Sequence, residues 1–231
     1  MPSPDRPWSA KDYNAATDVL RGLKPDAYPL RGDAKSGAVF ARFVADENLA
    51  FGRDATLPLD VRFPESIDAL AASRALSGLY IEALQHGVEV GPETLALFQY
   101  LFAEASSLLD MTDAFLLTLD PKDPKYAVRI HGATRVVAGL GEMALGAAMT
   151  LSEKHTYAVD DLRAFSDGLR STLPKIVARL DAAHRKDVVD RITEARDKET
   201  DPAYKASLSD LLQAIEKEPP KVLAPEATEP P

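Results

Sequence analysis

Apolar side chains recur with helical spacing along most of the chain, and the pattern is clearest between residues 92 and 119. Positions alternately three and four residues apart form a heptad seam there, and further leucines widen the apolar face. A helix that is apolar over so much of its surface is expected inside a bundle. The seam consists of Leu95, Phe98, Phe102, Ala105, Leu109, Thr112, Leu116 and Leu119.

A second seam follows, between residues 126 and 151, and predicts another core helix. The segment between the two, Asp120-Pro121-Lys122-Asp123-Pro124, predicts a turn, because proline interrupts helical hydrogen bonding and aspartate favours caps. The two helices are therefore expected to form an antiparallel hairpin. The second seam consists of Tyr126, Ile130, Ala133, Val137, Leu140, Ala144, Ala147 and Leu151.

The remaining pattern also predicts helices, with one exception. Ser9 and Asp12 form a pair that resembles a capping box and should start a first helix. Another helix should run over about 64–86. Between Gly52 and Pro64 the apolar residues alternate with polar ones, but Pro58 interrupts the pattern and no second strand is evident, so a loop packed across the bundle is expected there. Shorter, more charged helices are expected over 159–172, 173–199 with a break near Asp181, and 202–217.

These elements predict an all-α protein: an antiparallel helical bundle with a more charged C-terminal helical layer and a disordered C-terminal tail. In this interpretation residues 1–8 are a flexible lead and residues 9–217 are the bundle domain. Within that domain, 9–158 form the core part and 159–217 the C-terminal layer. Residues 218–231 are rich in proline and glutamate with little to bury, so disorder is expected there.

Composition narrows the classes of function. The chain of 231 residues has a formal net charge of −9, which argues against binding the nucleic-acid backbone. The absence of cysteine excludes thiolate catalysis and cysteine-ligated metals. Residues 136–151 are almost wholly apolar but shorter than the roughly 20 residues that a membrane span needs. The predicted location is the cytoplasm, with export behind a signal segment missing from this sequence as the alternative.

Three glycines lie seven residues apart on the second core helix: Gly132, Gly139 and Gly146. Each glycine inside a helix costs roughly 1 kcal/mol relative to alanine, so the row calls for a compensating gain. Close helix packing within the bundle is the first interpretation. A self-association face and a groove for an apolar ligand are the alternatives.

Counting equal distances from the turn at Lys122 brings charged residues of the two core helices opposite one another. Asp113 falls near His131, and Asp110 falls near Arg135. An Asp–His pair can orient a general base, so these residues are the candidate catalytic and binding groups, with structural ion pairing as the competing interpretation. The same counting in the preceding hairpin sets Arg74 opposite Glu104.

No motif predicts a metal site or a cofactor. The four histidines are isolated, and no calcium loop or glycine-rich phosphate loop is present. The sequence therefore favours a non-enzymatic protein-interaction module, such as an adaptor, an inhibitor or a toxin-neutralising partner, with another protein or a second copy as its partner. A carrier or sensor of an apolar small molecule is the second hypothesis, and a hydrolase-like enzyme the third.

Overall fold

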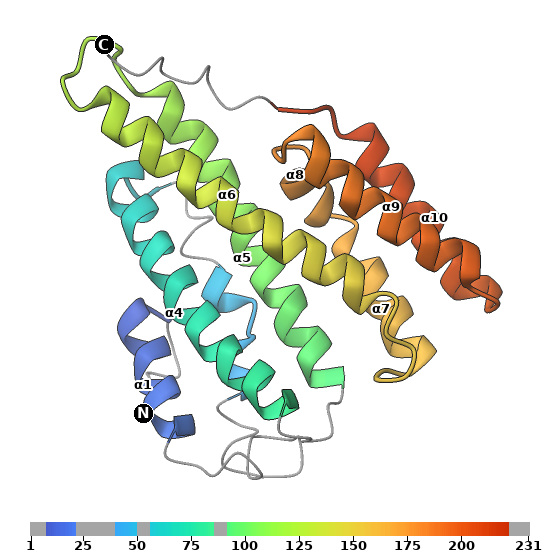
Figure 1. The fold of residues 1–231 in the computed structure, drawn as a ribbon. Coiled ribbons are helices and arrows are strands. Elements are labelled where there is room, and N and C mark those ends of the chain that lie inside the picture. The colour runs from blue at the N-terminus through green and yellow to red at the C-terminus, as the bar shows by residue number, and fades with distance from the viewer. Residues whose placement is uncertain (1–7, 22–39, 50–55, 86–91, 222–231) are drawn as a thin grey trace. The chain divides into compact units, whose positions relative to one another are not determined.

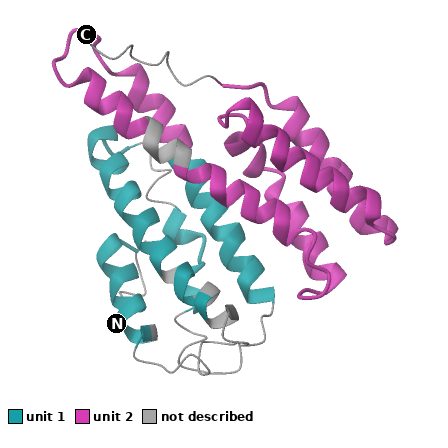
Figure 2. Cartoon of the chain, in the orientation of Figure 1, with its two compact units in different colours: residues 1–108 teal, residues 109–231 magenta. Residues whose placement is uncertain are grey.

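The computed structural model describes residues 8–21, 40–49, 56–85 and 92–221. Every regular element in these ranges is an α-helix, which confirms the all-α prediction (Figure 1). None of the described helices has the length and apolar character that crossing a membrane would require. The chain divides into two compact units, residues 1–108 and 109–231, and the boundary falls inside a helix (Figure 2).

The first unit contains α1 (Ala10–Arg21), α4 (Leu59–Gln85) and most of α5 (Pro92–Leu117). The predicted cap starts α1, because the backbone N–H of Ser9 donates to Oδ2 of Asp12 over 2.9 Å. Helix α1 packs on α4. In this unit the α5 seam is buried except at Phe98, which is half-buried, and the added leucines are buried as well: Leu95, Leu97, Leu101, Phe102, Ala105 and Leu108.

The loop expected between Gly52 and Pro64 is wrong from Leu59 onward, because α4 already begins there. Phe63 and Leu70 are buried, whereas Val61 is 43% exposed, so burial follows a helical period instead of the alternation. Pro58 precedes the helix, and its carbonyl accepts a hydrogen bond from the N–H of Arg62 over 3.0 Å. Three of the alternating apolar residues, Leu59, Val61 and Phe63, therefore lie in one helix, and the prediction used the wrong period.

The second unit contains the end of α5, α6 (Tyr126–Thr150), α7 (Val159–Leu169), α8 (Leu173–Val177), α9 (Ala182–Lys198) and α10 (Pro202–Lys217). The predicted turn is present, since Asp120 and Asp123 accept backbone hydrogen bonds over 2.8 Å. After α5 the chain turns back into α6 (Figure 1). The seam of α6 is buried at Ile130, Ala133, Leu140, Ala144, Ala147 and Leu151.

Residues 159–217 enclose apolar side chains of their own together with α6. Helix α10 contacts α7, α8 and α9, and α6 contacts α8 and α9. The break predicted near Asp181 is confirmed, because its carboxylate caps α9 by accepting from the N–H of His184 over 2.9 Å. Tyr204 of α10 is fully buried and donates its hydroxyl to the carbonyl of Leu151 over 2.6 Å. This hydrogen bond connects α10 to the end of α6.

Candidate functional site

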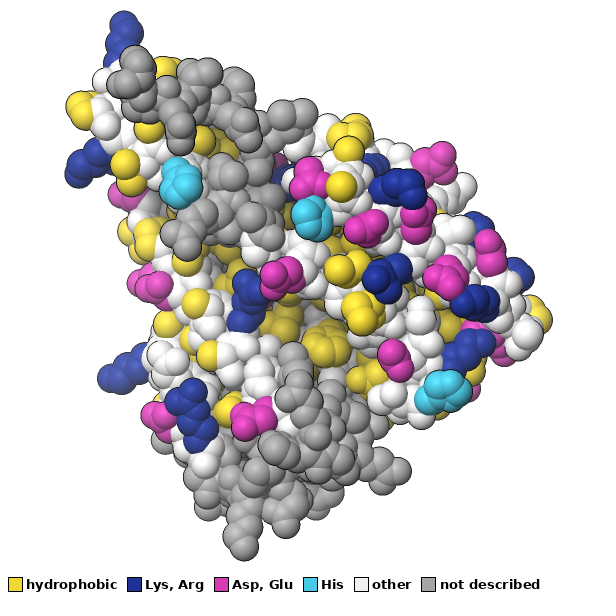
Figure 3. Space-filling model, viewed as in Figure 1, with side chains coloured by type: hydrophobic (Ala, Val, Ile, Leu, Met, Phe, Trp, Pro, Cys, Tyr) yellow, Lys and Arg dark blue, Asp and Glu magenta, His cyan; other side chains and the backbone are white. Residues whose placement is uncertain are grey.

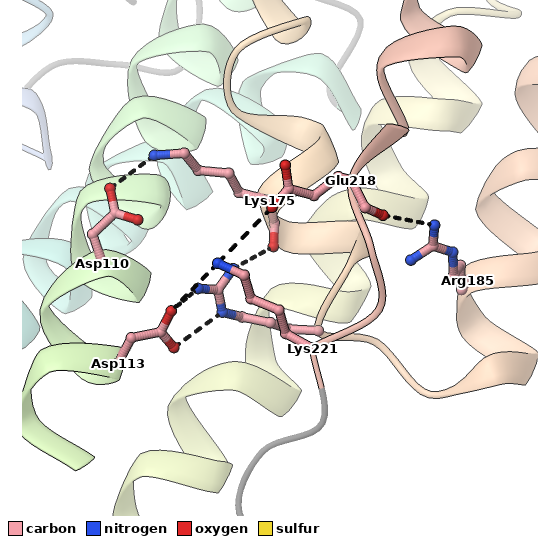
Figure 4. A network of polar contacts seen from close by, with 7 residues as sticks. Asp110, Asp113, Lys175, Arg185, Glu218 and Lys221 are labelled. Atoms are coloured by element: carbon pink, nitrogen blue, oxygen red, sulfur yellow. Dashed lines mark hydrogen bonds and ion pairs between the residues drawn. The ribbon is translucent and has the colours of Figure 1, made fainter. Parts of the chain in front are cut away.

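The proposed catalytic pair is not assembled. Asp113 accepts hydrogen bonds from the guanidinium of Arg179, whose side chain is only 1% exposed, and Nζ of Lys221 lies 3.8 Å from its Oδ2 (Figure 4). His131 is exposed on α6. The predicted Asp113–His131 contact is therefore wrong, since the carboxylate pairs with cations that come from later in the chain. Equal counting from the turn could not reveal these cations.

Asp110, which was predicted to pair with Arg135, also binds a cation from later in the chain. Its Oδ2 lies 2.8 Å from Nζ of Lys175, in a pair that is exposed on both sides (Figure 4). The side chain of Arg135 lies outside the described residues. Both aspartates of α5 therefore bind cations from the α8 region, and their arrangement is that of structural ion pairs.

The same network fixes the start of the expected tail. The N–H of Lys221 donates to the carbonyl of Ala178 over 2.8 Å, and Nη2 of Arg185 donates to the carbonyl of Glu218 over 3.1 Å. Residues 218–221 are thus held by hydrogen bonds, so disorder was the wrong prediction for them. Disorder was predicted because the segment contains few apolar residues, but backbone groups and one lysine hold it by hydrogen bonds and an ion pair instead. Residues 222–231 lie outside the described residues.

Among the described carboxyl groups, one glutamate of the first unit has the most strongly raised pKa. Glu104 of α5 accepts a hydrogen bond from Oγ of Ser73 on α4 over 2.5 Å, and its other oxygen lies 3.4 Å from the hydroxyl of Tyr13 on α1. Burial raises the pKa of Glu104 to about 7, even though the hydroxyls of Ser73, Tyr13 and Tyr100 favour the charged form. Arg74, expected opposite Glu104, is exposed and is not among the groups that set this pKa.

Two tyrosines complete this buried-acid cluster, which comprises Tyr13, Ser73, Tyr100 and Glu104. The hydroxyls of Tyr13 and Tyr100 hydrogen-bond to each other, and burial raises the pKa of both phenols, with the charge of Glu104 adding to the effect. Because the three helices contribute one or two members each, the cluster ties α1 and α4 to α5. It can hold a proton near neutral pH.

Aromatic rings cover the cluster on one side. The ring of Trp8 lies 5.3 Å from that of Tyr13, and the ring of Phe43 lies 5.5 Å from both tyrosines. Asn48 lies beside these rings, since its Oδ1 accepts a hydrogen bond from the backbone N–H of Trp8 over 2.9 Å. Rings this close are in direct contact, so the layer is a packed support for the acid. No sequence motif marks the cluster, although Tyr100 and Glu104 lie four residues apart on one face of the predicted helix.

The glycine row does not pack as expected. Gly132 and Gly146 are exposed, and a Cβ added to either would have no atom within 4 Å. Gly139 is half-buried. Gly141 has the close contact instead, because its Cβ would lie 3.3 Å from Cδ2 of Leu180. The prediction of internal packing is thus wrong for the outer two glycines.

Among the described residues, no group of three or more histidine or acidic side chains could hold a metal ion. Comparison with protein-family models, with curated proteins and with solved structures found no match to this chain.

Proposed function

We propose that the protein acts by binding another polypeptide through one face of α6. We call it the glycine face and define it as Gly132, Gly139 and Gly146 with Val128 and Met149 at its ends. Seven residues make slightly less than two helical turns, so the three glycines share one side of the helix. The glycine face would thus be the surface of the protein-interaction module that the sequence favours.

The observation that supports it is the open space beside Gly132 and Gly146. A glycine inside a helix lowers its stability by roughly 1 kcal/mol relative to alanine. Close packing within the chain explains that loss at Gly141 but not at these two positions. A partner backbone that approaches the face closely would explain it, because only glycine lets two helices come so near.

The ends of the face point to a protein partner. Val128 is 73% exposed and Met149 is 47% exposed, so two apolar side chains flank the glycines. Burial of an apolar side chain of this size contributes about 1.5–3 kcal/mol when it is complete. A helix laid along the face would cover both.

The net negative charge of the chain does not by itself define a binding surface for a basic partner. On the face that Figure 3 shows, basic and acidic side chains are interspersed over the α9 and α10 side of the molecule, without a continuous acidic area. Several of them pair along the helix, as Lys198 does with Glu194 and Lys186 with Asp190. Charges compensated in this way offer little attraction to a basic partner.

Photo-crosslinking tests the proposal. Benzoylphenylalanine replaces Val128 at the end of the glycine face, or the exposed Val61 of α4 as the matched control, in cells that make the protein. We expect a defined polypeptide to crosslink from position 128 and not from position 61. The crosslink should disappear when Gly132→Leu and Gly146→Leu are added, but persist with Gly78→Leu, a change at an exposed glycine of α4.

Equal crosslinking from both valines, or a crosslink that Gly132→Leu and Gly146→Leu leave unchanged, contradicts the proposal. Circular dichroism and thermal melting of each variant confirm that it is folded.

A further inference from the structure

The buried-acid cluster contains a small number of hydroxyl hydrogens that can be counted against its contacts. Oε2 of Glu104 lies 2.5 Å from Oγ of Ser73, and Oγ of Ser73 lies 2.9 Å from the carbonyl oxygen of Leu70. Oε1 of Glu104 lies 3.4 Å from the hydroxyl of Tyr13, which also hydrogen-bonds to the hydroxyl of Tyr100. Each of these four contacts needs one hydrogen, and each hydroxyl carries only one.

All four hydrogen bonds can form together only when Glu104 is protonated. On one side the acid then donates to Ser73, and Ser73 donates to the carbonyl of Leu70. On the other side Tyr100 donates to Tyr13, and Tyr13 donates to the acid. The ionised acid only accepts, so three hydrogens remain for four contacts, and Ser73 must leave either the carboxylate or the carbonyl. The geometry of the cluster therefore matches the neutral acid.

The described cations nearby do not neutralise the ionised acid. Burial raises the pKa of Glu104 to about 7, and the groups that oppose this rise are hydroxyls of α1, α4 and α5. Arg42 partly offsets the raised pKa that burial gives Tyr13, and its Nη1 lies 3.8 Å from a carboxylate oxygen of Glu47. Arg74 of α4 is exposed. Loss of the proton thus leaves a buried charge without a cation beside it among the described residues.

Helix α1 covers the acid and is the shortest helix described in this unit. It has 12 residues against 27 in α4 and 26 in α5, and it packs on α4 (Figure 1). Tyr13 of α1 is fully buried. Trp8, just before α1, is buried too, and its Nε1 has no hydrogen-bond partner among the described residues. Docking of α1 therefore keeps an acid and an N–H donor from water, and a short helix can open without the rest of its unit.

We propose that α1 is a proton-controlled cover of the first unit, docked while Glu104 holds its proton and released when the proton leaves. Release lets water reach the carboxylate, which removes the penalty of a buried charge. It also uncovers the ring of Phe43, which lies 5.5 Å from that of Tyr13 in the docked form. This inference concerns the first unit and is independent of the glycine face.

Hydrogen exchange of the full chain, measured by mass spectrometry on peptides of α1, α4 and α10, tests the proposal. The pKa of Glu104 is about 7 with α1 docked and returns toward 4.5 in water, so opening of α1 should increase at least about tenfold from pH 5.5 to pH 8. This comparison follows correction for the pH dependence of exchange itself. Glu104→Gln should hold the opening of α1 constant within about twofold. Glu82→Gln, at an exposed glutamate of α4, should behave like wild type, and α10 should not respond.

Linkage provides a second measurement. If the proton favours docking, then docking must favour the proton, and loss of docking must lower the pKa of Glu104. Tyr13→Ala removes the ring that holds α1 over the acid. Carbon-13 NMR of the Glu104 carboxyl should therefore show titration near pH 7 in wild type and close to 4.5 in Tyr13→Ala, while α4 keeps its protection from exchange.

Three results would overturn the proposal. Opening of α1 that does not change with pH in wild type would show that the proton does not control docking. A pKa near 7 that persists in Tyr13→Ala would show that α1 does not cover the acid. Loss of protection in α1 and α4 together would show that the unit opens as a whole, with no separate cover.

Discussion

Replacing Glu104 with glutamine should make the first unit more stable at neutral and alkaline pH. The carboxyl lies between α1, α4 and α5, and burial raises its pKa to about 7 from 4.5. Glutamine has nearly the same shape and can still accept the hydrogen bond from Ser73. It carries no charge, so it avoids the penalty of ionising a buried group.

The sign and size follow from proton linkage. The folded chain binds the proton of Glu104 more tightly than the unfolded chain, so stability is highest below about pH 4.5 and falls as the pH rises to about 7. A difference of about 2.5 pKa units corresponds to a loss of up to about 3 kcal/mol, complete above pH 7. Glu104→Gln should lack this loss. The two proteins should be nearly equally stable near pH 4.5 and differ most near pH 8.

Urea unfolding followed by tryptophan fluorescence can measure the difference. Trp8 is the only tryptophan and contacts Tyr13 of the same unit, so its emission reports on the first unit. Glu82→Gln, at an exposed glutamate of α4, is the control and should follow the wild-type curve at every pH. If Glu104→Gln also runs parallel to wild type from pH 5 to about pH 8, the buried-acid argument fails.

Three further predictions concern the second unit, measured by urea unfolding with circular dichroism. Gly146→Ala should stabilise it by up to about 1 kcal/mol, while Gly141→Ala should gain less or lose stability, because its methyl would press on Leu180; equal effects would contradict the packing. Asp113→Asn should cost up to about 3 kcal/mol, because the buried guanidinium of Arg179 loses its carboxylate and keeps only neutral acceptors such as the carbonyl of Lys175, whereas Asp110→Asn should cost at most about 1 kcal/mol. Ending the chain before residues 218–221 should cost about 1–3 kcal/mol relative to ending it after them, and no loss would mean that their hydrogen bonds contribute nothing.

Helix positions could be predicted from the sequence because their signals are local. The seam of α6 is buried at every described position except Tyr126, which is half-buried. Asp181 and Asp201 cap the helices that follow them, and each accepts from a backbone N–H three residues later. Caps and apolar periodicity depend only on residues within a turn or two, so one sequence is enough to find them.

Side-chain pairs between distant segments could not be predicted in the same way. Counting from a turn assumes that the nearest helix supplies the partner, yet Arg179 and Lys221 reach Asp113 from 66 and 108 positions further along the chain. The prediction for Glu104 was wrong for a related reason, since its neighbours on α4 and α1 contribute hydroxyl groups where a cation was expected. The residue of α4 that contacts the carboxyl is Ser73, one position before the expected Arg74, so the predicted ion pair is replaced by a hydrogen bond to a buried acid.

The error on the three glycines has a different cause, because the side of α6 on which they lie could have been worked out from the sequence. Each residue turns an α-helix by about 100°, so the side of α6 that carries Gly132, Gly139 and Gly146 points away from the buried seam at Ile130, Ala133 and Leu140. Internal packing was predicted from spacing alone, without that rotation. With it, Gly141 falls on the core side, where the structure places Leu180 against it, and the outer glycines fall on the surface. A row that lowers helix stability on the side away from the core calls for an explanation outside the chain, and this makes the α6 surface the first place to test for a partner.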